Sequence, residues 1–203
     1  MRTFYRRSLF GSIFPYLLCL PFAYSSIDGG LSQAQPSPQQ PSIPSELERL
    51  EYFEGTWNCQ QPAGSTKPSG AFNWTVNQDL NQFWYVANAK QTVAPANGFP
   101  INSREFMGYD TASKQLIRSV VVSNGNSYNM TASDWQDEKL VWSGIIVRKG
   151  QATPLRQEII KNSPNKFTAT YFFPDESDEW TPVVNESCDR FMPPTTKNEQ
   201  SSK

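Results

Sequence analysis

The chain has 203 residues, which is long enough for one domain and an export signal but short for two domains. Its 18 basic and 19 acidic residues give a formal charge of −1, so the sequence offers no basic surface for nucleic acid or an anionic membrane. Histidine is absent, which removes the commonest general base, the most frequent zinc ligand and the usual axial ligand of haem. We therefore expect no metal and no cofactor, and haem coordination through histidine is excluded.

Residues 1–25 predict a signal peptide. Residues 1–7 contain three arginines and no acidic residue, an apolar run broken by two prolines follows, and Ala23-Tyr24-Ser25 has the small-x-small pattern that a signal peptidase requires. Because the run is short for a membrane span, we expect cleavage and an exported protein, periplasmic or secreted, whose mature domain does not insert into a membrane. The alternatives are an uncleaved anchor and a lipid on Cys19, although bulky Leu18 argues against lipidation.

Composition divides the rest of the chain into three parts. Residues 26–45 are rich in Pro, Gln and Ser and contain almost nothing apolar, which predicts an extended, disordered linker. Residues 193–203 form a polar tail that we also expect to be disordered. The folded domain is predicted between them, at residues 46–192.

The domain is predicted to open with a short helix in the stretch SELERLEYFEG. Ser45 is a favourable N-cap, Glu48 lies three residues later as in a capping box, and Gly55 can end the helix. An apolar stripe at helical spacing is formed by Leu47, Leu50 and Phe53.

After this helix the pattern indicates strands and turns only. Nine or ten consecutive strands are predicted, at residues 53–62, 70–77, 81–93, 104–110, 114–123, 127–135, 139–148, 154–161, 166–173 and 179–191. Most are joined by short connectors rich in Asp, Asn, Gly and Ser. A meander of this length best avoids exposed edges by closing, so we expect an all-β, up-and-down antiparallel barrel of about eight to ten strands. A two-sheet sandwich is the alternative.

Aromatic residues gather on one face of the predicted strands. Two-residue periodicity places on this face Phe72, Trp74, Phe83, Tyr85, Tyr128, Met130, Leu140, Trp142, Phe167 and Tyr171. These side chains either fill the barrel or line a cavity. We predict a ligand cavity lined by Trp74, Tyr85, Arg118, Trp142 and Tyr171. Arg118 and Gln157 share strand parity with apolar neighbours, so each can point inward, and an inward arginine is a candidate anchor for a ligand carboxylate.

The motifs LEYFEGTW and FMGYD resemble the lipocalin-like or calycin barrels. More narrowly, their Gly-x-Trp and Gly-Tyr-Asp resemble a bacterial domain-of-unknown-function family, over residues 47–173. The resemblance implies that Trp57 packs at the closed end of the barrel beneath an arginine from the last strand, a role that Arg190 matches. Related barrels bind haem through a histidine on a late strand, which this chain lacks. The resemblance supports the fold more than a function. Asp110, the last residue of the second motif, is best explained as a turn cap.

Cys59 and Cys188 are predicted to form a disulfide. Export places them in a compartment that can be oxidising, and they are the only pair available once Cys19 is removed. In a closed meander with an even strand count, the first and last strands are antiparallel neighbours. Pairing Cys59 with Cys188 then sets Trp57 opposite Arg190, where the guanidinium can stack on the indole.

The first functional hypothesis is an exported barrel that binds a small apolar or amphipathic molecule. The alternatives are an enzyme that uses Asp, Glu, Tyr or Arg on a substrate inside the barrel, and a structural or interaction protein with a filled barrel. No catalytic residue and no metal ligand is assigned. The sequence does not indicate an oligomeric state.

Overall fold

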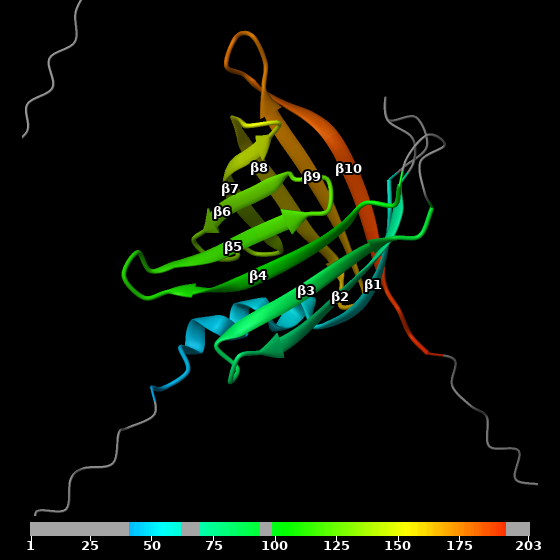
Figure 1. The fold of residues 1–203 in the computed structure, drawn as a ribbon. Helices are drawn as coiled ribbons and strands as arrows, with labels where there is room; N and C mark the ends of the chain where they lie inside the picture. The colour runs from blue at the N-terminus through cyan, green and yellow to red at the C-terminus, as the bar shows by residue number, and fades with distance from the viewer. Residues whose placement is uncertain (1–40, 62–69, 94–98, 194–203) are drawn as a thin grey trace, which may run out of the picture. The chain divides into compact units, whose positions relative to one another are not determined.

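Ten antiparallel strands close into an up-and-down barrel in the computed structural model, which describes residues 41–61, 70–93 and 99–193 (Figure 1). Each strand pairs with its neighbours in sequence, and β1 pairs with β10 to close the barrel. The strands are β1 (Gly55–Gln60), β2 (Ala71–Asp79), β3 (Trp84–Gln91), β4 (Asn102–Asp110), β5 (Gln115–Val122), β6 (Ser127–Ala132), β7 (Lys139–Arg148), β8 (Gln151–Ser163), β9 (Lys166–Pro174) and β10 (Trp180–Arg190). The predicted all-β barrel is therefore confirmed.

The predicted signal peptide lies outside the described residues, as do most of the predicted linker and nearly all of the predicted tail. None of the helical structure that is described combines the length and apolar character that a membrane-spanning helix needs.

A 3₁₀ helix, η1 (Ser45–Phe53), precedes the barrel. Its predicted apolar stripe is buried, and the spacing of exactly three residues suits a helix with three residues per turn. The predicted capping box is wrong. Pro44 occupies the N-cap, so Ser45 lies inside the helix, and no side chain caps its first turn. Glu54 rather than Gly55 follows the last turn, and Gly55 opens β1 with a φ of 110°, a conformation that favours glycine.

Aromatic side chains join η1 to one end of the barrel. The ring of Phe53 lies 5.6 Å from that of Trp74 and 5.9 Å from that of Phe167. Trp57 packs 4.8 Å from Phe167, and its indole N–H donates a hydrogen bond to the carbonyl of Phe53 at 2.8 Å. Edge-to-face pairs of this kind each contribute about 0.5–1.5 kcal/mol beyond the area they bury. They close this end of the barrel.

The seam between β1 and β10 has the predicted register. Cys59 lies opposite Cys188, and the predicted disulfide between them is confirmed, with Cα atoms 4.0 Å apart. Trp57 lies opposite Arg190, whose guanidinium carbon is 4.2 Å from the centre of the indole ring. Arg190 also donates hydrogen bonds to the carbonyls of Tyr52, at 2.8 Å, and Glu54. One arginine therefore ties the last strand to the first strand and to η1.

The Gly-Tyr-Asp motif of β4 has a structural explanation. Gly108 lies opposite the ring of Trp84, and a Cβ at this position would come within 2.8 Å of that ring. The Asp110 carboxylate accepts hydrogen bonds from the Ala112 N–H at 3.0 Å and the Ser113 hydroxyl at 2.6 Å. The Ser113 bond is the main reason that the pKa of Asp110 lies below its ordinary value. Asp110 therefore caps the turn after β4, as interpreted from the sequence.

Candidate ligand-binding cavity

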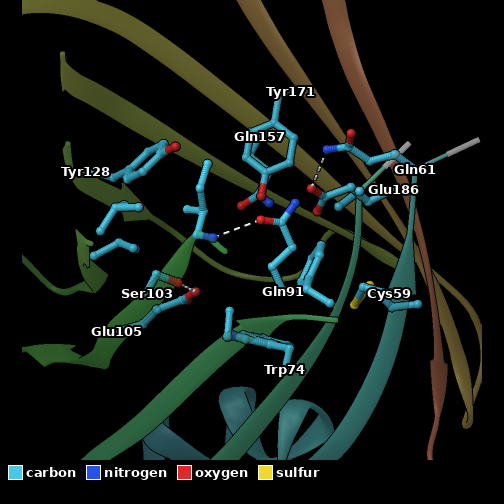
Figure 2. Close-up of a pocket in the computed structure, with 18 of the residues that line it drawn as sticks. Cys59, Gln61, Trp74, Gln91, Ser103, Glu105, Tyr128, Gln157, Tyr171 and Glu186 are labelled. Carbon is cyan, nitrogen blue, oxygen red and sulfur yellow. Dashed lines mark hydrogen bonds between the residues drawn. A yellow bond between two sulfur atoms is a disulfide. The ribbon is translucent and has the colours of Figure 1, made fainter. Parts of the chain in front are cut away.

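The barrel encloses a cavity of about 400 Å³. Trp74 lies nearest to η1 and packs on Phe53. The cavity is also lined by three residues at or beside strand ends: Gln61 after β1, Gln91 at the end of β3 and Ile101 before β4. Figure 2 shows Trp74 on the helix side of the cavity, with Gln61, Gln91, Tyr171 and Glu186 beyond it. The volume falls in the range of sites that hold small organic molecules.

Most of the cavity wall is apolar. It is formed by the alternating inward residues of the strands, and its apolar members include Phe72, Trp74, Ala89, Val120, Val122, Met130, Ile159, Phe167 and Ala169. Two small residues, Ala89 and Ala169, stand where larger side chains would occupy the space. The interior is thus packed with aromatic rings beside η1 and hollow farther from this helix.

An ion pair is buried on one side of the cavity. The Arg118 guanidinium donates to one carboxylate oxygen of Glu105 from Nε at 3.0 Å and from Nη2 at 2.6 Å, and from Nη1 to the amide oxygen of Gln157 at 2.6 Å. The exposed fractions of the three residues are 7%, 4% and 2%. Burial lowers the pKa of Arg118, but the combined influence of Glu105, Tyr171 and Glu186 exceeds it and the net shift is upward, so the guanidinium stays charged.

Arg118 also lies beside two indole rings. Its guanidinium carbon is 5.8 Å from the ring of Trp74 and 5.9 Å from that of Trp142. Cation–π attraction at this range adds to the ion pair. The guanidinium is thus held by a carboxylate, an amide and two aromatic rings before any ligand enters. That Arg118 anchors a ligand carboxylate stays a prediction, and Glu105 and Gln157 already accept hydrogen bonds from its three guanidinium nitrogens.

Glu186 is a second inward carboxylate, on β10 two residues before Cys188. Its Oε1 accepts a hydrogen bond from the Gln61 amide at 3.4 Å (Figure 2). Burial raises the pKa of Glu186 to about 7, against the opposing influence of Gln61 and Arg118. Burial, and then the charge of Glu186, hold the pKa of Tyr171 well above its ordinary value. At neutral pH this part of the wall therefore presents a carboxyl that is about half ionised beside a neutral phenol.

Three of the five residues predicted to line the cavity do so: Trp74, Arg118 and Tyr171. Tyr85 and Trp142 point inward but are not among the residues that line this cavity. Tyr85 is buried and borders a separate depression beside η1, and Trp142 is fully buried beside Arg118. Strand parity defines the face on which a side chain lies, but it does not give the height along the barrel axis.

The polar part of the wall was largely missed. Glu105 shares parity with Ser103 and Met107 on β4, and Glu186 shares parity with Cys188 on β10. Because these neighbours face the barrel interior, the shared strand face indicates that both carboxylates point inward. Gln157 was recognised as an inward candidate, and it accepts a hydrogen bond from Arg118. No group of three or more Cys, Asp or Glu residues suited to a metal ion occurs in the described part of the chain.

No protein-family model matches the chain, and no curated protein matches its sequence. Among solved structures, Rv2717c from M. tuberculosis is similar, with a TM-score of 0.54 and 8% sequence identity over 74% of this chain and 100% of that chain. A redesigned β-barrel gives a TM-score of 0.40 and 9% identity over 71% of this chain and 96% of that chain. The likeness to Rv2717c supports the barrel fold alone.

Proposed function

We propose that this protein binds a small, largely apolar molecule inside its barrel. The observation that carries the proposal is the cavity of about 400 Å³, whose wall combines apolar and aromatic side chains with a few inward polar groups. This is the composition typical of small-molecule sites. The alternative of a filled barrel loses its main support, because the interior beyond Trp74 is not filled by the described side chains.

The rigidity of the wall supports the same proposal. The disulfide residues Cys59 and Cys188 line the cavity, as does the Arg118–Glu105 pair with its bond to Gln157. These contacts join parts of the chain to one another and hold this part of the wall in place, and a preorganised wall lowers the entropic cost of binding.

We also propose that the protein is exported and that it belongs to the calycin-like barrels. The disulfide supports export, because such bonds persist mainly in oxidising compartments. The closed ten-strand meander and the stacking of Arg190 on Trp57 support the calycin-like assignment.

A second candidate function is catalysis, and Glu186 is the observation that favours it. A carboxyl with a pKa of about 7 inside a cavity is suited to general acid or base chemistry at neutral pH. The Tyr171 hydroxyl beside it can donate a hydrogen bond. A Glu186→Gln variant that still binds a substrate but no longer converts it is the result expected of an enzyme.

Native mass spectrometry of protein purified from its own host tests the binding proposal. We expect the wild-type protein to carry a non-covalent small molecule, and an Ala89→Phe variant to lose it because the new ring enters the cavity. Asn88→Phe is the matched control, since Asn88 is the exposed neighbour on the outer face of β3. If each of the three proteins shows only the mass of its own polypeptide, the proposal is contradicted.

A further inference from the structure

The positive and negative charges on the described side chains of the cavity wall do not cancel. Among the described residues, the wall has three side chains that carry a full charge when ionised: Glu105, Arg118 and Glu186. Glu105 and Arg118 form an ion pair at 2.6 Å and neutralise each other. Glu186 takes part in none of the ion pairs found in the described part of the chain. The described residues of the wall therefore carry one acidic group in excess.

We propose that the ligand carries one positively charged nitrogen, an amine or a quaternary ammonium on an apolar body, and that this nitrogen pairs with Glu186. The inference rests on the proposed function and names the chemical class of its ligand. The excess carboxylate supplies the charge, and the apolar wall accommodates the body.

The surroundings of Glu186 suit a cation. Aromatic side chains on the wall include Phe72, Trp74, Tyr128 and Tyr171, and their ring faces attract positive charge. Glu186 accepts a hydrogen bond from Gln61 on one oxygen. A carboxylate has about four acceptor sites, more than Gln61 and the Tyr171 hydroxyl use, so an ammonium N–H can be added. Figure 2 shows Gln61, Glu186 and Tyr171 together on one side of the cavity.

The charged and titratable groups that act on Glu186 come from several strands. Arg118 on β5 favours its ionised form, Glu105 on β4 opposes it, and Tyr171 on β9 stabilises it through its hydroxyl. Burial is the largest influence and disfavours the ionised form. A ligand cation at this place supplies the opposite charge that the free protein lacks, so binding and ionisation of Glu186 favour each other.

An anionic ligand is disfavoured by the same geometry. The one arginine of the wall already pairs with Glu105 on two of its nitrogens and with Gln157 on the third. A ligand carboxylate would therefore add a third acidic group to a cavity with a single cation. Like charges brought together in a low-dielectric site repel strongly.

The test compares decylamine, decanol and decanoate, which share one apolar chain and differ only in the head group. Each competes with the neutral fluorescent dye N-phenylnaphthylamine for the full-length protein. We expect decylamine to bind about tenfold more tightly than decanol at about pH 8.5, and decanoate to bind most weakly. The advantage of decylamine should fall toward about pH 6 as Glu186 gains a proton, because an alkylamine stays protonated over this range.

Glu186→Gln should remove the advantage of decylamine while leaving dye and decanol affinity unchanged, which also shows that the variant is folded. Asp189→Asn is the matched control, because it removes one charge from an exposed position on the same strand. If the dye binds but decylamine has no advantage over decanol, or if Glu186→Gln retains the advantage, the inference is wrong and the binding proposal stands. If neither the dye nor any of the three compounds binds the wild-type protein, the proposed function fails as well.

Discussion

Cys59 lies directly opposite Cys188 on the paired strands β1 and β10, and the disulfide between them crosslinks the seam at which the barrel closes. The two cysteines are 129 residues apart in the chain. One covalent bond therefore joins the first strand of the sheet to the last. Both side chains point into the cavity, so the bond also forms part of its wall.

Loss of this disulfide should destabilise the barrel strongly. A crosslink over a loop of this length lowers the entropy of the unfolded chain, which corresponds to about 4–5 kcal/mol before any strain in the folded state. We expect the free energy of unfolding of Cys59→Ala/Cys188→Ala, measured in urea, to fall by a value of this order. A change below about 1 kcal/mol, or two titratable thiols in the denatured, unreduced mature protein, would contradict the assignment.

Arg190→Lys should destabilise the closed end although it keeps the charge. Lysine cannot reproduce the stacking on Trp57 together with hydrogen bonds to the carbonyls of Tyr52 and Glu54, so we expect a loss of about 1–3 kcal/mol in chemical denaturation. Arg104→Lys is the control, because Arg104 is exposed and lies 5.6 Å from Phe106. Equal effects of the two substitutions would show that the contacts of Arg190 contribute nothing specific.

The seam and the closed end are the parts of the fold that could be predicted best. Cysteine pairing, strand alternation and a constant residue sum across antiparallel strands together place Trp57 opposite Arg190. The start of η1 was predicted less well. The pattern favours Ser45 as the N-cap, but the helix begins one residue earlier, with Pro44 at the N-cap and no side-chain cap, and helix ends are commonly displaced by one or two residues.

The cavity could be predicted only in part. Periodicity shows that Trp74 and Trp142 share a face, but it does not show that one borders the cavity while the other is buried beside Arg118. Burial of Glu105 and Glu186 runs against the ordinary preference of carboxylates for water. Such residues are recognised only when their ion-pair or hydrogen-bond partners are known, and those partners come from other strands.

Because Arg118 and Glu105 form a buried ion pair, the effect of replacing one of them on stability should depend strongly on whether the other is present. Glu105→Gln or Arg118→Met alone leaves one charge buried without its partner, and each should cost about 3–5 kcal/mol of stability. The double variant removes both charges, so it should cost much less than the sum of the two single changes. Urea unfolding of the four proteins measures the coupling. Additive effects would mean that the pair is not formed in solution.

Glu186 predicts a pH dependence of stability. Because its folded-state pKa of about 7 lies above the ordinary value of 4.5, the folded protein holds an extra proton between these values. Its contribution is therefore greatest at low pH and is lost as pH rises from about 4.5 to about 7. We expect Glu186→Gln to match the wild type near pH 4 and to exceed it by about 3 kcal/mol near pH 8.

The difference between the two proteins is the quantity to measure, because groups such as Asp110 and Glu158, whose pKa values are lowered, titrate equally in both. A difference that does not change with pH would show that the Glu186 carboxyl is as well solvated in the folded protein as in the unfolded chain.

The central claim, a cavity inside the barrel that accepts a small apolar molecule, is tested most directly by fluorescence titration with N-phenylnaphthylamine. The wild-type protein and Asn88→Phe should bind one dye molecule per chain with a saturable rise in emission. Ala89→Phe, whose new ring takes up part of the cavity, should bind the dye much more weakly. Equal saturable binding by Ala89→Phe would place the dye outside the cavity, and no binding by the wild type would contradict the claim.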